Sequence, residues 1–325
     1  MVVHVKKIGV LGGGVMGSAI ADIMALNGKD VIIKDVSQDI LDKSRFMIEK
    51  NIDELIQFHK NRADKEIKRI EQDDGITLTE EQRQKIRQKF KPAYDESTKK
   101  TALSRIRTTT SWDDFKDADI VIEAIIENMD AKKEAFKILD QTAPKHAVLA
   151  TNTSSLSITE IASVTQRRDR IIGLHFFNPP TTLPLVEIIP GFETSEETIS
   201  DVVDFISSVR NHRYSMQPVR VKDVPGFLVN RVLFTMLNEA FACYEEGVAS
   251  MKDIDLAMKS GAGIPMGPFE LSDLIGIDVM YHIMKEMNRM NGGNVMQRPV
   301  QTINKMFHSG RWGRKTGKGF YDYSK

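Results

Sequence analysis

Residues 7–17 read KIGVLGGGVMG, in which an apolar strand pattern runs into spaced glycines and then into the start of a helical pattern. The glycines follow the spacing G-x-G-x-x-G. The first permits a tight turn, the second lets the backbone approach a pyrophosphate, and the third lets the helix pack on the strand. The phosphates then meet free N–H groups at a helix N-terminus. The stretch predicts a dinucleotide-binding βαβ unit, and the expected contact residues are Gly12, Gly14, Val15, Met16 and Gly17.

A second strand pattern, DVIIKD at residues 30–35, ends in Asp35. A carboxylate about 20 residues beyond such glycines accepts hydrogen bonds from the adenine ribose 2′-hydroxyl, and its charge repels the 2′-phosphate of NADP. A helix cap at a strand end is the alternative interpretation of Asp35. Because the glycines and the acid occur together, we predict NAD as the cofactor.

The first two thirds of the chain alternates short apolar runs with helix-length amphipathic segments. This rhythm predicts an α/β fold with a Rossmann-type, doubly wound, mostly parallel sheet. The runs expected to form strands are 7–11, 30–35, 120–123, 148–150, 171–174 and 185–189. Residues 59–107 break the rhythm because they are rich in charge and hold few large apolar residues. We expect this insertion to form a solvated helical hairpin that projects from the sheet.

After about residue 222 the pattern becomes helical. Apolar residues recur at helical spacing between Val229 and Tyr244, and Ser250 with Asp253 resembles a capping box for the next helix. We therefore divide the chain into an NAD-binding domain, 1–221, and a smaller all-α domain, 222–325. The segment GRKTGKG (313–319) lacks the glycine spacing of a phosphate loop, and we interpret it as a closing turn.

The composition limits the function classes. The chain has 325 residues, with 45 Lys and Arg balancing 45 Asp and Glu, so net charge gives no reason to expect a nucleic-acid partner. A single cysteine excludes a disulfide framework and a multi-cysteine metal site, and we expect no metal. The sequence has neither a signal or transit pattern nor an apolar run of membrane-spanning length. The expected protein is soluble and cytoplasmic, without a membrane partner.

His175 and Glu187 form the first candidate catalytic pair. His175 lies in LHFFNPP (174–180), at the end of an apolar run that the prolines terminate, and ligands bind at the carboxyl ends of strands in open parallel sheets. Glu187 interrupts the apolar run 185–189, where a carboxylate is costly unless it is paired. A His–Glu pair satisfies the carboxylate and orients an imidazole for proton transfer. A structural histidine is the less favoured alternative.

Polar residues also follow the strand pattern at 148–150. In NTSS (152–155), Ser154 can bind a substrate oxygen and Asn152 can contact the nicotinamide ribose, although a helix cap before Leu156 explains these residues equally well. Asn230, in PGFLVNR (225–231), opens the long helix of the second domain. By itself it is compatible with simple solvation.

The motifs GGGVMG, EAIIEN, NTSSL, LHFFNPP, LVEII, KDVPGFLVNR, GAGIPMGPFEL and GRKTGKGFY occur in this order. Together they resemble the L-3-hydroxyacyl-CoA dehydrogenase family, which includes 3-hydroxybutyryl-CoA dehydrogenases, over nearly the whole chain outside residues 59–107. The resemblance implies a Rossmann-type domain that binds NAD, a helical C-terminal domain that forms a homodimer, and reversible oxidation of a (S)-3-hydroxyacyl-CoA, on short chains such as 3-hydroxybutyryl-CoA, in fatty acid metabolism such as β-oxidation.

The resemblance also implies roles for single residues. His175 matches the catalytic base and Glu187 the carboxylate that orients it. Ser154 matches the serine that hydrogen-bonds the reacting oxygen, and Asn230 the asparagine that helps to hold substrate and histidine. Asp35 matches the ribose ligand. The positions that match the nicotinamide half of the cofactor site are Glu127, Lys132, Asn152 and Ser154.

The chain departs from the family where the helical hairpin usually contributes a serine and a lysine to CoA. Here the corresponding stretches read KNI (50–52) and QFHK (57–60). Lys60 and Arg62 are the candidates for the CoA phosphates, with simple surface solvation as the alternative.

Three other functions remain possible on sequence grounds. A related dehydrogenase of a sugar acid such as L-gulonate would use the same histidine and glutamate, and fold and motifs would barely distinguish it. A non-catalytic NAD-binding protein is disfavoured because all four candidate catalytic residues are present. A nucleic-acid role for residues 59–107 is least favoured, because acids and bases are mixed there and aromatic residues are few.

Overall fold

The computed structural model describes residues 5–290 and 301–324, so the expectations that concern residues 1–4 lie outside the described residues. The chain forms two compact units. The first comprises the residues up to Thr153 together with Ile158–Arg220, and the second comprises Ser154–Ser157 together with the residues from Val221 onward. Among the described residues, no helix combines the length and apolar character needed to cross a membrane.

The first unit is built on an eight-stranded sheet with the strand order β3-β2-β1-β4-β5-β6-β7-β8. All neighbouring strands are parallel except β6 and β7, which are antiparallel. The strand order reverses between β1 and β4, which is where open α/β sheets bind nucleotides. The strands are β1 Lys7–Leu11, β2 Asp30–Lys34, β3 Ile106–Thr109, β4 Ile120–Glu123, β5 Val148–Thr151, β6 Ile171–Phe176, β7 Leu185–Pro190 and β8 Gln217–Arg220.

The mostly parallel α/β fold confirms the sequence prediction, and six strands were expected. The two that were not expected, β3 and β8, read IRTT and QPVR and lie at the two edges of the sheet. An edge strand is buried less completely than a central one, so neither needs the continuous apolar run that marks the other six.

Helices cover both faces of the sheet. Alternate strand residues such as Ile8, Val10 and Ile33 join residues of α1, α2 and α7 in one core cluster. On the opposite face space is tight, because a Cβ on Gly9 would lie 2.8 Å from the Phe115 ring and one on Gly173 would lie 2.8 Å from the Ile158 side chain. The helices of this unit are α1 Val15–Leu26, α2 Gln38–Gln72, α3 Glu80–Lys89, α4 Glu96–Ser104, α5 Met129–Thr142, α6 Ile158–Ala162 and α7 Glu196–Ser207, with short 3₁₀ turns at Asp113–Phe115 and Arg168–Arg170.

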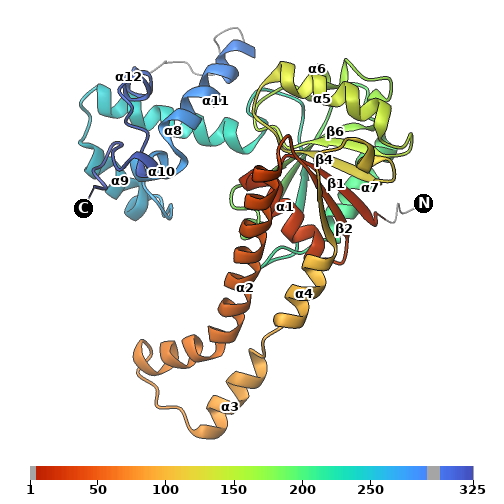
Figure 1. Cartoon of the computed structure of the whole chain (residues 1–325). Helices are drawn as coiled ribbons and strands as arrows, with labels where there is room; N and C mark the ends of the chain where they lie inside the picture. Colours follow the sequence, from red (N-terminus) through yellow and green to blue (C-terminus); the bar gives the residue numbers. More distant parts are fainter. Residues whose placement is uncertain (1–4, 291–300, 325) are drawn as a thin grey trace. The chain divides into compact units, whose positions relative to one another are not determined.

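The predicted helical hairpin is present, with different bounds. The 35-residue helix α2 leads away from the sheet, and α3 and α4 lead back to it (Figure 1). The hairpin therefore begins at Gln38 rather than at residue 59, and its last predicted residues belong to β3. The first half of α2 buries apolar residues such as Leu41, Ile48 and Ile52 against the core. Because of these residues the sequence pattern there is that of the sheet domain, and the change to a charged pattern near residue 59 falls in the middle of one continuous helix.

The second unit is helical, as expected. Its helices are α8 Val229–Glu245, α9 Met251–Gly261, α10 Pro268–Ile275, α11 Ile277–Met290 and α12 Thr302–His308, with a 3₁₀ turn at Arg314–Thr316. Ser250 caps α9, since its hydroxyl accepts the N–H of Asp253. The Asp253 carboxylate bonds the Ser250 hydroxyl and not the backbone, so only half of the predicted capping box forms.

The GRKTGKG segment is a closing turn, as predicted. A Cβ on Gly313 would lie 2.3 Å from the Asp273 carbonyl oxygen, so this close approach requires glycine. The buried Asp273 carboxylate accepts the backbone N–H groups of Phe320 (2.8 Å) and Tyr321 (2.9 Å). Phe320 thereby packs into the core cluster of the second unit.

Candidate functional site

The three glycines after β1 occupy three different environments. Gly12 has a φ of +110°, and a Cβ there would lie 2.5 Å from the Ala124 carbonyl oxygen. A Cβ on Gly17 would lie 1.9 Å from the Gly12 carbonyl oxygen, whereas one on Gly14 would have nothing within 4 Å. The first and third glycines therefore serve the turn and the helix packing, and the second leaves open space beside the backbone. That space fits a pyrophosphate.

The start of α1 is suited to bind an anion. Gly14 is its N-cap residue, no side chain caps the first turn, and that turn holds no acidic residue. Val15 and Met16 are the first two helical residues, and Val15 is exposed. Uncapped N–H groups at a helix N-terminus favour phosphate.

Asp35 follows β2 and faces the glycine turn. Its carboxylate accepts the backbone N–H of Gly13 and that of Val36, each at 2.6 Å. Val36 and Ile126, which lie just beyond the ends of β2 and β4, are 79% and 71% exposed. Sequence reasoning missed both. Large apolar side chains left open at the carboxyl ends of strands can cover the flat rings of a dinucleotide, and their position directly after strand patterns was the available signal.

Glu127 follows β4, Asn152 follows β5, and Lys132 lies in the first turns of α5. The Lys132 ammonium is 3.4 Å from a Glu127 carboxylate oxygen and 2.6 Å from Glu123, a buried residue that sequence reasoning missed. The Asn152 amide oxygen accepts the N–H of Phe176 at 2.9 Å, which ties the end of β5 to the end of β6. Glu123 carried the same signal as Glu187, a carboxylate within an apolar strand.

His175 and Glu187 form the predicted pair. They lie opposite each other in the antiparallel β6–β7 ladder, and His175 Nδ1 is 2.7 Å from Glu187 Oε2. The histidine side chain is 7% exposed and the glutamate is fully buried. An ionised carboxylate only accepts hydrogen bonds, so Nδ1 is the donor to Glu187, and in the neutral imidazole the lone pair then lies on Nε2. The pair therefore presents an oriented base.

Ser154 and Asn230 lie together in the second unit. The Asn230 amide nitrogen donates to the Ser154 carbonyl oxygen at 3.2 Å, and the nearby Ser157 hydroxyl donates to Asp223 at 3.0 Å. Asn230 is the second residue of α8. Phe227, just before this helix, has a φ of +49°, a conformation that non-glycine residues rarely adopt and that concentrates at functional sites.

The two CoA-phosphate candidates differ in their surroundings. Arg62 lines a cavity of about 440 Å³, and Lys60 does not. The cavity is formed by α2, the segment after α3 and the loop before β8, and its lining is cationic and aromatic: Phe58, His59, Arg62, Lys89, Phe90, Lys91, Ala93, Tyr94, Arg210, His212, Arg213 and Tyr214.

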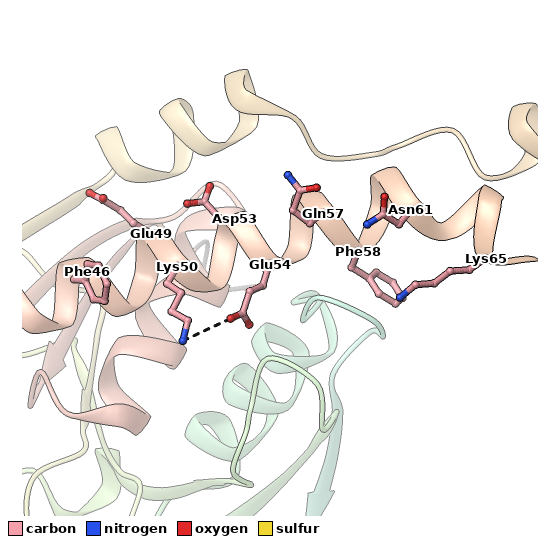
Figure 2. Close-up of a pocket in the computed structure, with 9 residues that line it drawn as sticks. All are labelled: Phe46, Glu49, Lys50, Asp53, Glu54, Gln57, Phe58, Asn61 and Lys65. Carbon is pink, nitrogen blue, oxygen red and sulfur yellow. Dashed lines mark ion pairs between the residues drawn. The ribbon is translucent and has the colours of Figure 1, made fainter.

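A second hollow runs along an outer face of α2. It is lined by three carboxylates, Glu49, Asp53 and Glu54, against two lysines, and Lys50 and Glu54 point toward each other with 3.8 Å between their charged atoms (Figure 2). Its charge does not suit a polyanion. Among the described residues, no group of three or more His, Cys, Asp or Glu side chains is placed to hold a metal ion.

Comparisons with known proteins identify the family of the chain. A model of the 3-hydroxyacyl-CoA dehydrogenase NAD-binding domain matches residues 7–83 and 76–224, and a model of the C-terminal domain of the same family matches residues 226–323. The hydroxyacyl-coenzyme A dehydrogenase of human mitochondria is 41% identical over 98% of this chain and 91% of its own. The 3-hydroxybutyryl-CoA dehydrogenase of Clostridioides difficile is 40% identical over 98% of this chain and all of its own.

Among solved structures, the (S)-3-hydroxybutyryl-CoA dehydrogenase of Ralstonia eutropha superposes with a TM-score of 0.81 at 36% identity, covering 99% of this chain and 100% of its own. These matches extend over both units. The chain therefore belongs to the 3-hydroxyacyl-CoA dehydrogenase family.

Proposed function

We propose that the protein catalyses the reversible, NAD-dependent oxidation of short-chain (S)-3-hydroxyacyl-CoA, such as 3-hydroxybutyryl-CoA, to the 3-oxoacyl-CoA. The reaction class and the cofactor follow from family membership. The observation that carries the chemistry is the buried pair in which Glu187 orients His175. Preference for short chains is supported by relatives named for the butyryl substrate.

In this proposal His175 Nε2 removes the proton of the C3 hydroxyl. The buried Glu187 carboxylate stabilises the imidazolium that forms. Ser154 hydrogen-bonds the reacting oxygen, and Asn230 helps to hold the substrate and the histidine. When bound, NAD supplies the hydride acceptor. A positioned proton-transfer group contributes about a hundred- to ten-thousand-fold to the rate. The His175→Gln variant should lose activity on that order and still bind NADH, and near-normal turnover by this variant would reject His175 as the base.

The direct test follows the loss of NADH absorbance while the purified protein reduces acetoacetyl-CoA. Parallel reactions replace NADH with NADPH, acetoacetyl-CoA with free acetoacetate, and the short acyl chain with a long one. Rapid turnover confined to NADH and the short thioester is expected. Oxidation of a free hydroxy acid such as L-gulonate in a separate reaction with NAD⁺ would point to a sugar-acid dehydrogenase. NADH binding without turnover of any substrate would point to a non-catalytic role.

The cavity around Arg62 is our proposed site for the CoA phosphates. Five cationic side chains line it without a lining carboxylate, and in the described parts of the chain none of the five forms an ion pair. Two of its arginines lie over rings, Arg62 4.7 Å from the centre of Phe90 and Arg213 5.7 Å from that of Phe58. The pKa of His59 is lowered from its ordinary value by burial and by the neighbouring Arg62, Arg210 and His212. The cavity is thus positive and has flat apolar walls, as a phosphorylated adenosine requires.

Substrate fragments test this assignment. The Arg62→Ala variant should raise the KM for acetoacetyl-CoA by about three- to tenfold, as expected for one partly exposed charged contact. Its KM for acetoacetyl-pantetheine, which lacks the adenosine phosphates, should not change. Arg69→Ala is the matched control, because Arg69 lies on the same helix and pairs with Glu66 and Asp74 outside the cavity. Equal effects on both thioesters would reject the site.

A homodimer is also proposed, formed through the helices of the second unit. Large apolar side chains on four of these helices or their connections stay exposed, among them Val232 (63%), Val248 (68%) and Leu256 (59%). Light scattering should give twice the chain mass of 36.7 kDa, and Leu256→Asp should shift it toward the monomer. A monomeric native protein would contradict the proposal. Cytoplasmic location stays a prediction from the sequence.

A further inference from the structure

The last residue of β4 is a buried carboxylate, Glu123. Glu123 is fully buried, and three groups donate to its two oxygens: the Lys132 ammonium at 2.6 Å, the backbone N–H of Ile125 at 2.7 Å and the Thr151 hydroxyl at 2.6 Å. Lys132 is itself 1% exposed. A buried ion pair is tolerated only when its remaining hydrogen-bonding capacity is met, and here the carboxylate is well satisfied.

The lysine also reaches outward. Its ammonium is 3.4 Å from Glu127, whose side chain is 38% exposed and whose other carboxylate oxygen accepts the Thr153 hydroxyl at 2.6 Å. Lys132 lies in the first turns of α5, where the helix dipole disfavours a cation. The negative charges of Glu123 and Glu127 offset this unfavourable interaction between the Lys132 ammonium and the helix dipole. The cluster Glu123, Lys132 and Glu127 therefore carries one net negative charge, and Glu127 is its exposed member.

The cluster lies beside the glycine turn. A Cβ on Gly12 would lie 2.5 Å from the carbonyl oxygen of Ala124, the residue after Glu123. The carboxyl ends of β1 and β4 flank the point where dinucleotides bind. The nicotinamide ring of NAD⁺ is cationic and that of NADH is neutral. A net negative charge at this edge therefore distinguishes the two forms of the cofactor.

We propose that this cluster raises the protein's affinity for NAD⁺ relative to its affinity for NADH. Glu127 supplies the charge near the ring, and Glu123 and Lys132 are positioning residues that fix the charge and balance it. This inference rests on the proposed function, because it assumes that the nicotinamide half binds at Glu127. A single charge at a partly exposed position changes such an affinity ratio by about three- to tenfold.

The test compares dissociation constants and needs no turnover. NADH binding is measured by its fluorescence and NAD⁺ binding by competition. Glu127→Gln keeps the shape and the bond to Thr153 but removes the charge. It should weaken NAD⁺ binding by about three- to tenfold and change NADH binding by less than about twofold. Glu134→Gln is the matched control, because Glu134 is an exposed residue of α5, the helix that follows Glu127, and it pairs with Lys137. Equal effects on NAD⁺ and NADH, or none, would overturn the proposal.

Variants that remove and then restore the net charge of the cluster distinguish an electrostatic effect on the affinity ratio from a structural one. Glu123→Gln also removes the net negative charge and should shift the ratio in the same direction as Glu127→Gln. The double variant Glu123→Gln with Lys132→Met restores one net negative charge and should return the ratio toward the wild-type value. A double variant that stays shifted would reject the electrostatic account. If the Glu123→Gln variant or the double variant fails to fold, the result for Glu127→Gln alone decides whether the proposal stands. Failure of the wild type to bind either dinucleotide would instead refute the proposed function.

Discussion

The strongest single prediction concerns Glu187→Gln. The buried carboxylate lies 2.7 Å from His175 Nδ1. A glutamine keeps its size and its amide oxygen can still accept the hydrogen bond from Nδ1–H, so the change removes mainly the charge. Two unit charges whose centres lie about 4 Å apart interact by about 4 kcal/mol at an effective dielectric constant of about 20. Each ~1.4 kcal/mol is a factor of ten in rate. Part of this energy offsets the desolvation of the carboxylate, so we expect kcat to fall by about 10²- to 10³-fold.

The assay is steady-state reduction of acetoacetyl-CoA, with NADH affinity and the melting temperature measured on the same samples. The KM for NADH should change by less than about threefold, because the pair acts on proton transfer. The control is Glu193→Gln, since Glu193 pairs with Arg168 at the surface, where both side chains are about half exposed. A folded Glu187→Gln variant that keeps more than about a tenth of the wild-type kcat would refute the reasoning.

Other variants test the cofactor site and the second unit. Gly17→Ala should abolish NADH binding in a fluorescence titration, because its Cβ would lie 1.9 Å from the Gly12 carbonyl oxygen. Gly14→Ala should leave the melting temperature unchanged and weaken NADH binding by about tenfold or more, because its Cβ meets only the open space assigned to the pyrophosphate; equal melting and binding losses would contradict this. Asp35→Ala should raise the relative use of NADPH, measured as the ratio of kcat/KM values, because the repelling charge is gone. Asp273→Asn should lower the free energy of unfolding by about 1–3 kcal/mol in urea titrations, since it weakens two buried hydrogen bonds to backbone N–H groups.

Sequence patterns predicted those features that depend on neighbouring residues. The glycine turn follows from steric limits within a few residues, and the structure shows why Gly12 and Gly17 cannot carry a side chain. Central strands can be recognised in the sequence because burial on both faces of the sheet requires a continuous apolar run. The edge strands β3 and β8 gave no such signal, because their exposed residues need not be apolar.

The candidate site was predictable where a residue violated its local pattern. Glu187 was recognised because a carboxylate inside an apolar strand requires a partner, and the structure supplies His175. The same logic applied to Glu123, which sequence reasoning passed over because its partner, Lys132, lies on a following helix whose pattern is amphipathic and ordinary. The cationic cavity around Arg62 could not be predicted, since its lining comes from three separated segments.

The sequence by itself determined the six inner strands of the sheet, the dinucleotide turn and the change to a helical second unit, because each depends on short-range sterics and the periodicity of burial. Only the tertiary structure decided that β7 turns antiparallel to β6, which sets Glu187 opposite His175, and that Lys132 is enclosed between two glutamates. Such pairings depend on the register and packing of segments distant in the chain, and their energy comes from burial that no local pattern encodes.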